Sequence, residues 1–181
     1  MNEETFWGII EKAGCPDLCP IEEQCERITA ALKPLHKADL VAFESLRHQL
    51  LVKAYTWPMI KASFIVLSYT SDDVFEDFRH WIILNGRKRF YEATLKPDRL
   101  AEFMSAEDAF EEINGEPLLF ACENAWSGKF EEIEKAVVYE EVQDITEEWP
   151  SKDVLASEFP KLFQRFWNEE RIQEMHDDAE Q

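Results

Sequence analysis

The apolar residues between Lys37 and Tyr55 recur at helical spacing for about five turns, and this stripe constrains the fold more than any other feature of the chain. Its members are Leu40, Phe43, Leu46, Leu50, Leu51 and Ala54. Such a stripe covers one side of an amphipathic helix, which buries that side in the protein. The chain also contains only 5 Gly, which is few for the tight turns of all-β proteins. We therefore expect an all-α, or predominantly α, fold.

Other segments have the same periodicity and are bounded by residues that begin or end helices. Ser71 is a suitable N-cap for the segment that follows it, and Gly14 and Gly86 are suitable terminators. The expected helices are Glu3–Ala13, a helix that begins at Pro20 and ends before Pro34, Met59–Leu67, Asp72–Asn85, a helix through Phe90 and Leu95, short turns at Arg99–Met104 and Ala106–Ile113, a stripe from Leu118 to Trp126, and a last helix near Phe159–Phe166. Within Glu131–Glu148, residues 135–142 fit a short strand, a helical turn or an irregular segment, and periodicity does not separate these alternatives.

These segments predict a single compact domain of about eight helices. A chain of 181 residues fits one domain. We place this domain at residues 1–173 and expect the acidic tail at 174–181 to be frayed.

Charge is distributed unevenly along the chain. The formal net charge is −19, and residues 1–100 contain 13 Lys/Arg and 15 Asp/Glu, whereas residues 101–181 contain 6 and 23. A nucleic-acid partner is therefore not expected, because phosphate binding needs a basic surface. The acidic half is either a solubilising surface or a docking surface for a basic protein.

The sequence also bears on location. No apolar run approaches the roughly 20 residues that span a bilayer. The start of the chain, Met1–Glu4, lacks the basic and apolar regions of a signal peptide. We expect a cytoplasmic protein that makes no membrane contact, and the sequence leaves its oligomeric state open.

The four cysteines match no standard metal-binding pattern. Cys15, Cys19 and Cys25 are clustered without a histidine among them, and Cys122 is distant. Reduced structural thiols are the favoured interpretation, with metal or iron–sulfur ligation as the alternative. A Cys25–His36 dyad is a further alternative. No cofactor is expected.

The segment Tyr55–Gly86 has the densest cluster of aromatic and charged residues. Helical geometry places Arg79 beside the apolar face of its helix, which predicts partial burial of the guanidinium. A buried guanidinium requires a carboxylate, and Asp72, Glu76 or Glu123 could supply one.

Three interpretations of this cluster remain open. The first is a structural network of ion pairs. The second is a pocket in which Arg79 binds an anionic group. Its candidate ligand-binding residues are Tyr55, Trp57, Asp72, Asp73, Arg79, Trp81 and Glu123. The third is a hard-cation site at Asp73 and Asp77, with His80 on the same solvent-facing side of the helix.

The order of several motifs resembles a known family. The motifs are Phe6-Trp7, Ala54-Tyr55-Thr56-Trp57, Ser71-Asp72-Asp73, Phe78-Arg79, Trp81-Ile82, Gly86, Phe90, Pro97-Asp98, Trp149-Pro150 and Phe159–Phe163. They resemble the bacterial domain-of-unknown-function family numbered 4240, over residues 4–167. The resemblance implies an all-helical bacterial protein and implies no reaction. The chain departs from it at Tyr69-Thr70, where a glycine-containing turn is expected.

Function is predicted from charge and from the lack of catalytic motifs. The sequence has no glycine-rich phosphate loop, no G-x-S-x-G elbow and no H-E-x-x-H helix. We expect a non-enzymatic acidic interaction protein, of the immunity or regulatory type, that binds a basic partner. The candidate partner-binding residues are Glu131, Glu132, Glu134, Glu140 and Glu141. The alternatives are a ligand-binding or enzymatic domain centred on Asp72, Asp73 and Arg79, and a subunit of an assembly with an aromatic self-interface.

Overall fold

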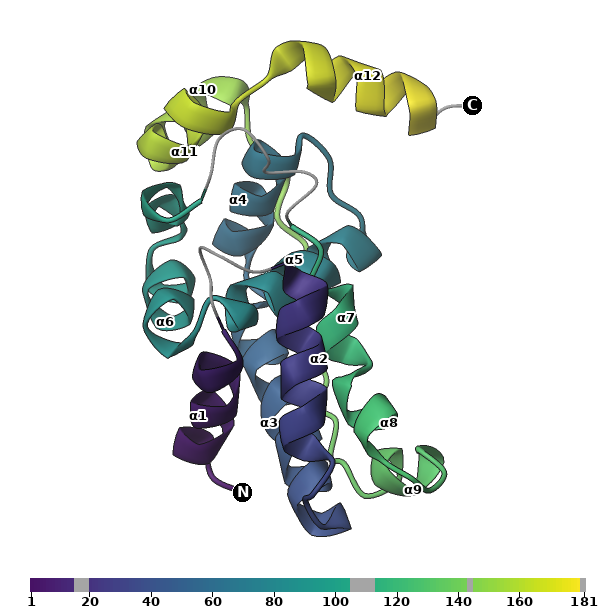
Figure 1. The fold of residues 1–181 in the computed structure, drawn as a ribbon. Coiled ribbons are helices and arrows are strands. Elements are labelled where there is room, and N and C mark those ends of the chain that lie inside the picture. The colour runs from purple at the N-terminus through teal and green to yellow at the C-terminus, as the bar shows by residue number, and fades with distance from the viewer. Residues whose placement is uncertain (15–19, 105–112, 143–144, 180–181) are drawn as a thin grey trace.

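The computed structural model describes residues 1–14, 20–104, 113–142 and 145–179, and all regular structure in these ranges is helical (Figure 1). In chain order the elements are α1 (Glu3–Ala13), α2 (Ile21–Leu32), α3 (Lys37–Ala54), α4 (Trp57–Leu67), α5 (Asp72–Leu84), α6 (Arg87–Leu95), the 3-10 helix η1 (Pro97–Glu102), α7 (Glu116–Leu119), α8 (Ala121–Ala125), α9 (Glu131–Glu134), α10 (Lys152–Glu158), α11 (Pro160–Phe166) and α12 (Glu169–Ala179). The all-α prediction is confirmed.

Helices α1, α4 and α5 begin at residues whose side chains satisfy a free backbone N–H group of the first turn. Asn2 accepts a hydrogen bond from the Thr5 amide (2.9 Å) at the start of α1. The Ser71 hydroxyl accepts one from the Val74 amide at the start of α5, which confirms Ser71 as an N-cap. These local contacts explain why such helices begin close to their expected positions.

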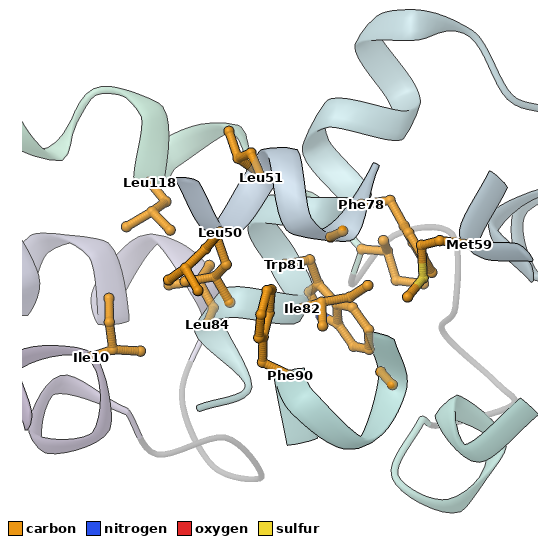
Figure 2. Close-up of a cluster of buried hydrophobic side chains, with 14 of the residues drawn as sticks. Ile10, Leu50, Leu51, Met59, Phe78, Trp81, Ile82, Leu84, Phe90 and Leu118 are labelled. Atoms are coloured by element: carbon orange, nitrogen blue, oxygen red, sulfur yellow. The ribbon is translucent and has the colours of Figure 1, made fainter. Parts of the chain in front are cut away.

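The core is centred on α3, which packs against α1, α5, α8 and α9, while α2 covers α1, α7 and α8. Side chains from six helices meet in the region shown in Figure 2. Those labelled there are Ile10, Leu50, Leu51, Met59, Phe78, Trp81, Ile82, Leu84, Phe90 and Leu118. All ten are buried, so the apolar stripe of α3 is used as expected.

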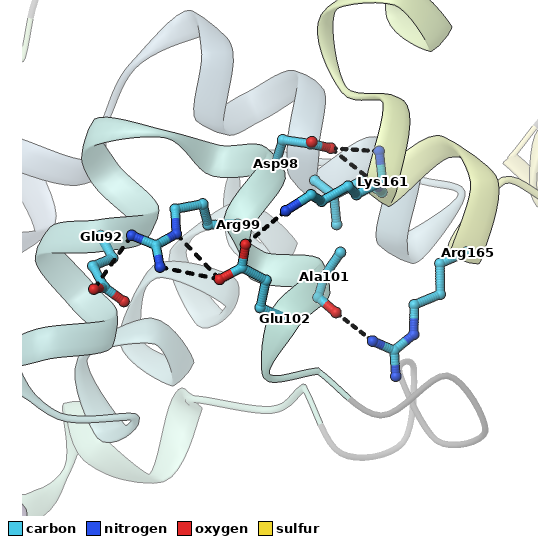
Figure 3. Close-up of polar contacts among 8 residues, drawn as sticks. Glu92, Asp98, Arg99, Ala101, Glu102, Lys161 and Arg165 are labelled. Atoms are coloured by element: carbon cyan, nitrogen blue, oxygen red, sulfur yellow. Dashed lines mark hydrogen bonds and ion pairs between the residues drawn. The ribbon is translucent and has the colours of Figure 1, made fainter.

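In the carboxyl-terminal region, α11 packs against α4 and η1, and α10 packs against α11 (Figure 1). Lys61 of α4 is buried and forms an ion pair with Glu158, at the end of α10. On η1, the Asp98 carboxylate accepts hydrogen bonds from the Lys161 and Leu162 amides, both at 2.9 Å (Figure 3). Asp98 thereby caps the start of α11, where the first backbone N–H groups have no partner within the helix.

One segment differs from the sequence expectation, one follows an alternative that the sequence left open, and one is not described. The stripe from Leu118 to Trp126 forms two helices, because α7 packs on α5 and α8 packs on α2. Residues 135–142 form the irregular segment that was one of the open alternatives, with neither a strand nor a regular helix. Of their apolar side chains only Val137 is buried, so little packing favours regular structure there. The expected helical turn at Ala106–Ile113 lies almost wholly outside the described residues.

The frayed tail expected from residue 174 stays a prediction. In the structure, α12 extends to Ala179. The Asn168 side chain accepts from the Arg171 amide (3.1 Å), and Gln173 donates to Asp177 (2.8 Å) one turn later. These local bonds suit a helix end and its first turns.

The turn between α4 and α5 shows how the chain does without the expected glycine. Ser68 takes the left-handed conformation (φ 63°) at the end of α4, a position that glycine usually occupies. The required backbone geometry is therefore supplied one residue before Tyr69-Thr70.

Among the described residues no single helix is both long and apolar enough to cross a bilayer, and α3 with α4 meets that criterion only as a pair bent by 85°.

Candidate functional site

One face of α3 forms the floor of a groove of about 710 Å³. The α3 residues that line it are Glu44, Arg47, His48, Leu51, Val52 and Tyr55. Their spacing of three and four residues keeps them on one side of the helix. From Glu44 to Tyr55 the floor is about 17 Å long, at the helical rise per residue.

Four other segments build the walls of this α3 groove. Its remaining lining residues are Glu76 and Arg79 of α5, Leu119, Phe120 and Glu123 around α7 and α8, Phe130, Glu131 and Glu134 around α9, and Tyr139, Glu140 and Val142. His48 fixes the last segment, since its Nε2 donates to the Glu140 carbonyl (3.1 Å) and its ring packs edge-on against Tyr139. The groove is therefore assembled from parts of the chain nearly 100 residues apart.

The charge of the groove is dominated by carboxylates. Its acidic lining residues are Glu44, Glu76, Glu123, Glu131, Glu134 and Glu140. Arg47 and Arg79 are the lining cations, and no lysine lines the groove within the described residues. Glu123, Glu131, Glu134 and Glu140 are exposed, so four carboxylates from three segments face solvent around the opening.

A buried polar triad lies beneath the floor at one end. Glu44 and Arg47 are 2% and 4% exposed, and they pair through several hydrogen bonds, including Nε to both carboxylate oxygens (3.1 Å each). Arg47 Nη1 also donates to His80 Nε2, which requires a neutral imidazole with its proton on Nδ1. Burial lowers the pKa of His80 well below its usual value, and Arg47 and Arg79 act in the same direction.

The second nitrogen of His80 is less well satisfied. Its Nδ1 has no hydrogen-bond partner of normal geometry among the described residues. The nearby Glu76 backbone carbonyl nevertheless acts to raise the pKa of His80. Burial outweighs that contribution, so the triad contains one fixed ion pair and a neutral histidine.

Arg79 lines the other end of the groove and is only 7% exposed. Its Nε donates to the Phe75 carbonyl (3.2 Å), and its Nη1 donates to the Leu51 carbonyl (3.0 Å). The guanidinium carbon lies 5.0 Å from the Tyr55 ring centroid and 4.7 Å from that of Phe75. The burial predicted for Arg79 is observed. Among the described residues, however, no carboxylate lies within 4 Å of the guanidinium, and backbone carbonyls and aromatic rings contact it instead.

The groove brings together only some of the predicted site residues. Those that line it are Tyr55, Arg79, Glu123, Glu131, Glu134 and Glu140. Those outside its lining are Trp57, Asp72, Asp73, Trp81, Glu132 and Glu141. Glu132 instead pairs with Lys37 at 3.1 Å. Residues predicted separately for a ligand and for a partner therefore share one groove.

The two tryptophans predicted as pocket walls serve packing. Trp57 packs edge-on against Trp149, and Trp81 stacks on Phe78 and Phe103. Trp81 points into the core, because α5 turns this side inwards (Figure 2). Trp57 instead packs on a residue of the segment before α10.

The hard-cation interpretation of α5 does not match the structure. His80 is fully buried on Arg47 and does not share the solvent-facing side with Asp73 and Asp77. The described residues contain no group of three potential metal ligands. Helical angle alone predicts an outward-facing His80, but α3 and α7 cover that side of α5.

Asp77 has an altered titration. Partial burial raises its pKa from 3.8 to about 6, and Glu116, Glu76 and Asp73 add to the rise. Between about pH 4 and 6, Asp77 is therefore largely protonated in the folded protein and largely ionised in the unfolded chain. The folded protein consequently loses stability as pH rises through that window.

Asp77→Asn is expected to stabilise the protein at pH 7 by about 1 kcal/mol, after discounting the shift for solvent screening. It should also flatten the decline in unfolding free energy between pH 4 and 6. Urea titrations at several pH values measure both effects, with the exposed Glu147→Gln variant as control. An unchanged slope in Asp77→Asn would show that Asp77 titrates normally.

The two cysteines in the described residues are buried free thiols. Burial raises the pKa of Cys25 to about 12, and that of Cys122 is raised for the same reason. Neither is a nucleophilic thiolate at neutral pH, which argues against the Cys25–His36 dyad. Cys15 and Cys19 lie outside the described residues.

Sequence reasoning missed Glu44, Arg47 and His48. A signal was present, because Arg47 follows Phe43 by four residues and precedes Leu50 by three, which puts a cation inside the apolar stripe. Glu44 lies within reach of it at three residues' distance.

Family membership is decided by the first two thirds of the chain. The profile of the family described as "protein of unknown function (DUF4240)" matches residues 1–127. The chain belongs to this family. The family resemblance is thus confirmed, but over 1–127 and not over the expected 4–167. No curated protein and no solved structure matches the chain.

The DUF4240 match divides the groove. It contains the α3 floor, Glu76, Arg79 and Glu123, whereas Glu131, Glu134 and Glu140 follow it in the sequence. The family region therefore supplies the buried cations, and the segment beyond it supplies half of the carboxylates.

Proposed function

We propose that this DUF4240 protein is a non-catalytic bacterial interaction protein, of the immunity or regulatory type, and that its α3 groove binds a basic segment of a protein partner. The observation that carries the proposal is the convergence of four exposed glutamates around one groove that no lysine lines within the described residues. Such an arrangement attracts lysine and arginine side chains and steers a basic partner to one place.

The ionisable groups of the floor favour binding over catalysis. Glu44 is held by Arg47, and the neutral His80 accepts from the same guanidinium. A general base must be free to take up a proton from a substrate. These groups are instead occupied in fixing α3 to α5.

The negative net charge of residues 101–181 also supports a basic partner. This half holds 23 Asp/Glu against 6 Lys/Arg, and it contributes Glu123, Glu131, Glu134 and Glu140 to the groove. A general solubilising role would not require these carboxylates to meet at one opening.

A lysine hexapeptide is a suitable probe, because about five extended residues span a 17 Å floor. We expect the triple variant Glu123→Lys, Glu131→Lys, Glu134→Lys to bind labelled hexalysine about tenfold more weakly than a control of equal net charge. The control is Glu147→Lys, Glu148→Lys, Glu174→Lys, at exposed positions outside the groove. Fluorescence anisotropy at 50 and 300 mM NaCl gives the affinities.

Binding should also weaken as salt rises, since the contacts are largely exposed. Equal losses in the two triple variants would show that the peptide responds to overall charge and not to the groove, and would refute the proposal.

A further inference from the structure

The charges of the α3 groove are arranged by sign along its length. Arg79 lies at one end, where it contacts Leu51 and Tyr55. Glu140 lies at the other, where its carbonyl accepts from His48. Helix α9, with Glu131 and Glu134, also packs on α3, and the Lys37–Glu132 pair ties it near the amino end of α3. Arg79 thus lies at the Tyr55 end, with the half-buried Glu76 three residues before it on α5, and the exposed carboxylates extend towards the opposite end.

Arg79 is buried without an ion-pair partner among the described residues. Two of its nitrogens donate to carbonyls, and Nη2 makes no hydrogen bond within the described part of the chain. Burial lowers the pKa of Arg79, while Glu76, Tyr55 and Asp72 act in the opposite direction from farther away. Burying an uncompensated charge is costly, and an anion that reaches it recovers part of that cost.

A free anion does not fit the groove as a whole. Six glutamates line the same space, and they repel a ligand with net negative charge. A ligand that carries one carboxylate at its end and several cations behind it satisfies both parts of the groove. The carboxyl terminus of a basic polypeptide has this arrangement.

We propose that the α3 groove recognises the carboxyl-terminal end of its basic partner, with the terminal carboxylate bound by Arg79 and the preceding lysine or arginine side chains bound by Glu131, Glu134 and Glu140. This inference rests on the proposed function and names the part of the partner that binds. About five extended residues cover the 17 Å from Tyr55 to Glu44, so the cations that matter lie within roughly the last five positions.

The guanidinium is already oriented for this role. Its Nε and Nη1 bonds and the rings of Tyr55 and Phe75 hold it in place, which lowers the entropy lost when a carboxylate binds. A planar guanidinium can also present two donors to one carboxylate.

The test compares hexalysine with a free carboxyl terminus and the same peptide with a terminal amide. The amide has one more positive charge, so attraction to the acidic groove alone makes it the tighter ligand. We expect the opposite order, with the free acid about tenfold tighter. In Arg79→Gln this preference should vanish or reverse, and in Arg79→Lys, which keeps the charge, it should fall to about twofold to threefold.

Each preference is a ratio measured within one variant, so a change in stability does not imitate it. Circular dichroism melting establishes that each variant is folded, and Arg79→Lys carries the test if Arg79→Gln does not fold. Equal affinity for the two peptides would overturn this inference and leave the proposed function standing. Failure of both peptides to bind would overturn both.

A third arm uses sodium acetate alone. If acetate raises the melting temperature of the parent protein but not of Arg79→Lys, and the peptides show no preference, then Arg79 takes small free carboxylates. That result would also overturn the inference.

Discussion

Gly115→Ala is expected to destabilise the protein by about 3 kcal/mol, the upper part of the range for overpacked cores. A Cβ at this position would lie 2.5 Å from Cβ of His80, and closer still to the Asp77 carbonyl oxygen and the Trp81 amide nitrogen. All three atoms are fixed in α5, so no side-chain rotation relieves the overlap. The backbone φ of −88° is ordinary, so glycine is required here for space and not for conformation.

The measurement is the free energy of unfolding from urea titrations, and Gly8→Ala is the matched control. Gly8 lies within α1, and an added Cβ there meets nothing within 4 Å. We expect Gly8→Ala to be neutral or stabilising by up to about 1 kcal/mol, the helix preference for alanine. A Gly115→Ala variant as stable as Gly8→Ala would mean that α7 does not approach α5 this closely.

The same contact bears on the groove. α7 carries Leu119 and precedes Glu123, so its approach to α5 sets the position of one groove wall. A folded Gly115→Ala protein should therefore also bind hexalysine less tightly than Gly8→Ala.

Arg47→Met is expected to cost about 3–5 kcal/mol, the loss typical of a broken buried ion pair. The substitution leaves the Glu44 carboxylate 2% exposed without its counterion. It also removes the donor to His80 Nε2, which is completely buried. An unsatisfied buried carboxylate and an unsatisfied ring nitrogen both oppose folding.

Two further variants separate this effect from a general loss of packing. The double variant Glu44→Leu, Arg47→Met removes both charges and should be more stable than Arg47→Met alone, because no uncompensated carboxylate remains. Arg87→Met removes an exposed pair with Glu3 (3.8 Å) and should change stability by less than about 1 kcal/mol. If Arg47→Met cost no more than Arg87→Met, the triad would contribute nothing beyond a surface pair.

The proposed binding mode combines recognition of basic side chains with recognition of a carboxylate in the same groove. The charges of the buried Glu44–Arg47 pair cancel and His80 is neutral, so the free charges of the groove are those of Arg79, Glu76 and the exposed glutamates. Arg79 belongs to the DUF4240 region, whereas Glu131, Glu134 and Glu140 follow it. Charge selection and carboxylate recognition are thus carried by different parts of the chain.

The amino-acid sequence by itself determined the positions of most helices and the sign of the surface charge. The α3 stripe, the Ser71 cap and the termini at Gly14 and Gly86 depend on contacts within a few residues, and such contacts can be recognised from spacing alone. Burial of Arg79 was also predictable, since it depends on the angle of one residue around one helix. The excess of carboxylates after residue 100 required only counting.

Only the tertiary structure decided which of these residues meet. Arg79 shares a groove with Glu131 and Glu140, and not with its helix neighbours Asp72 and Asp73, because α3 and α5 turn one face each towards segments 40 to 90 residues away. His80 is buried for the same reason. Helical periodicity fixes the side on which a residue lies, but the element that covers that side is chosen by long-range packing, on which a local pattern carries no information.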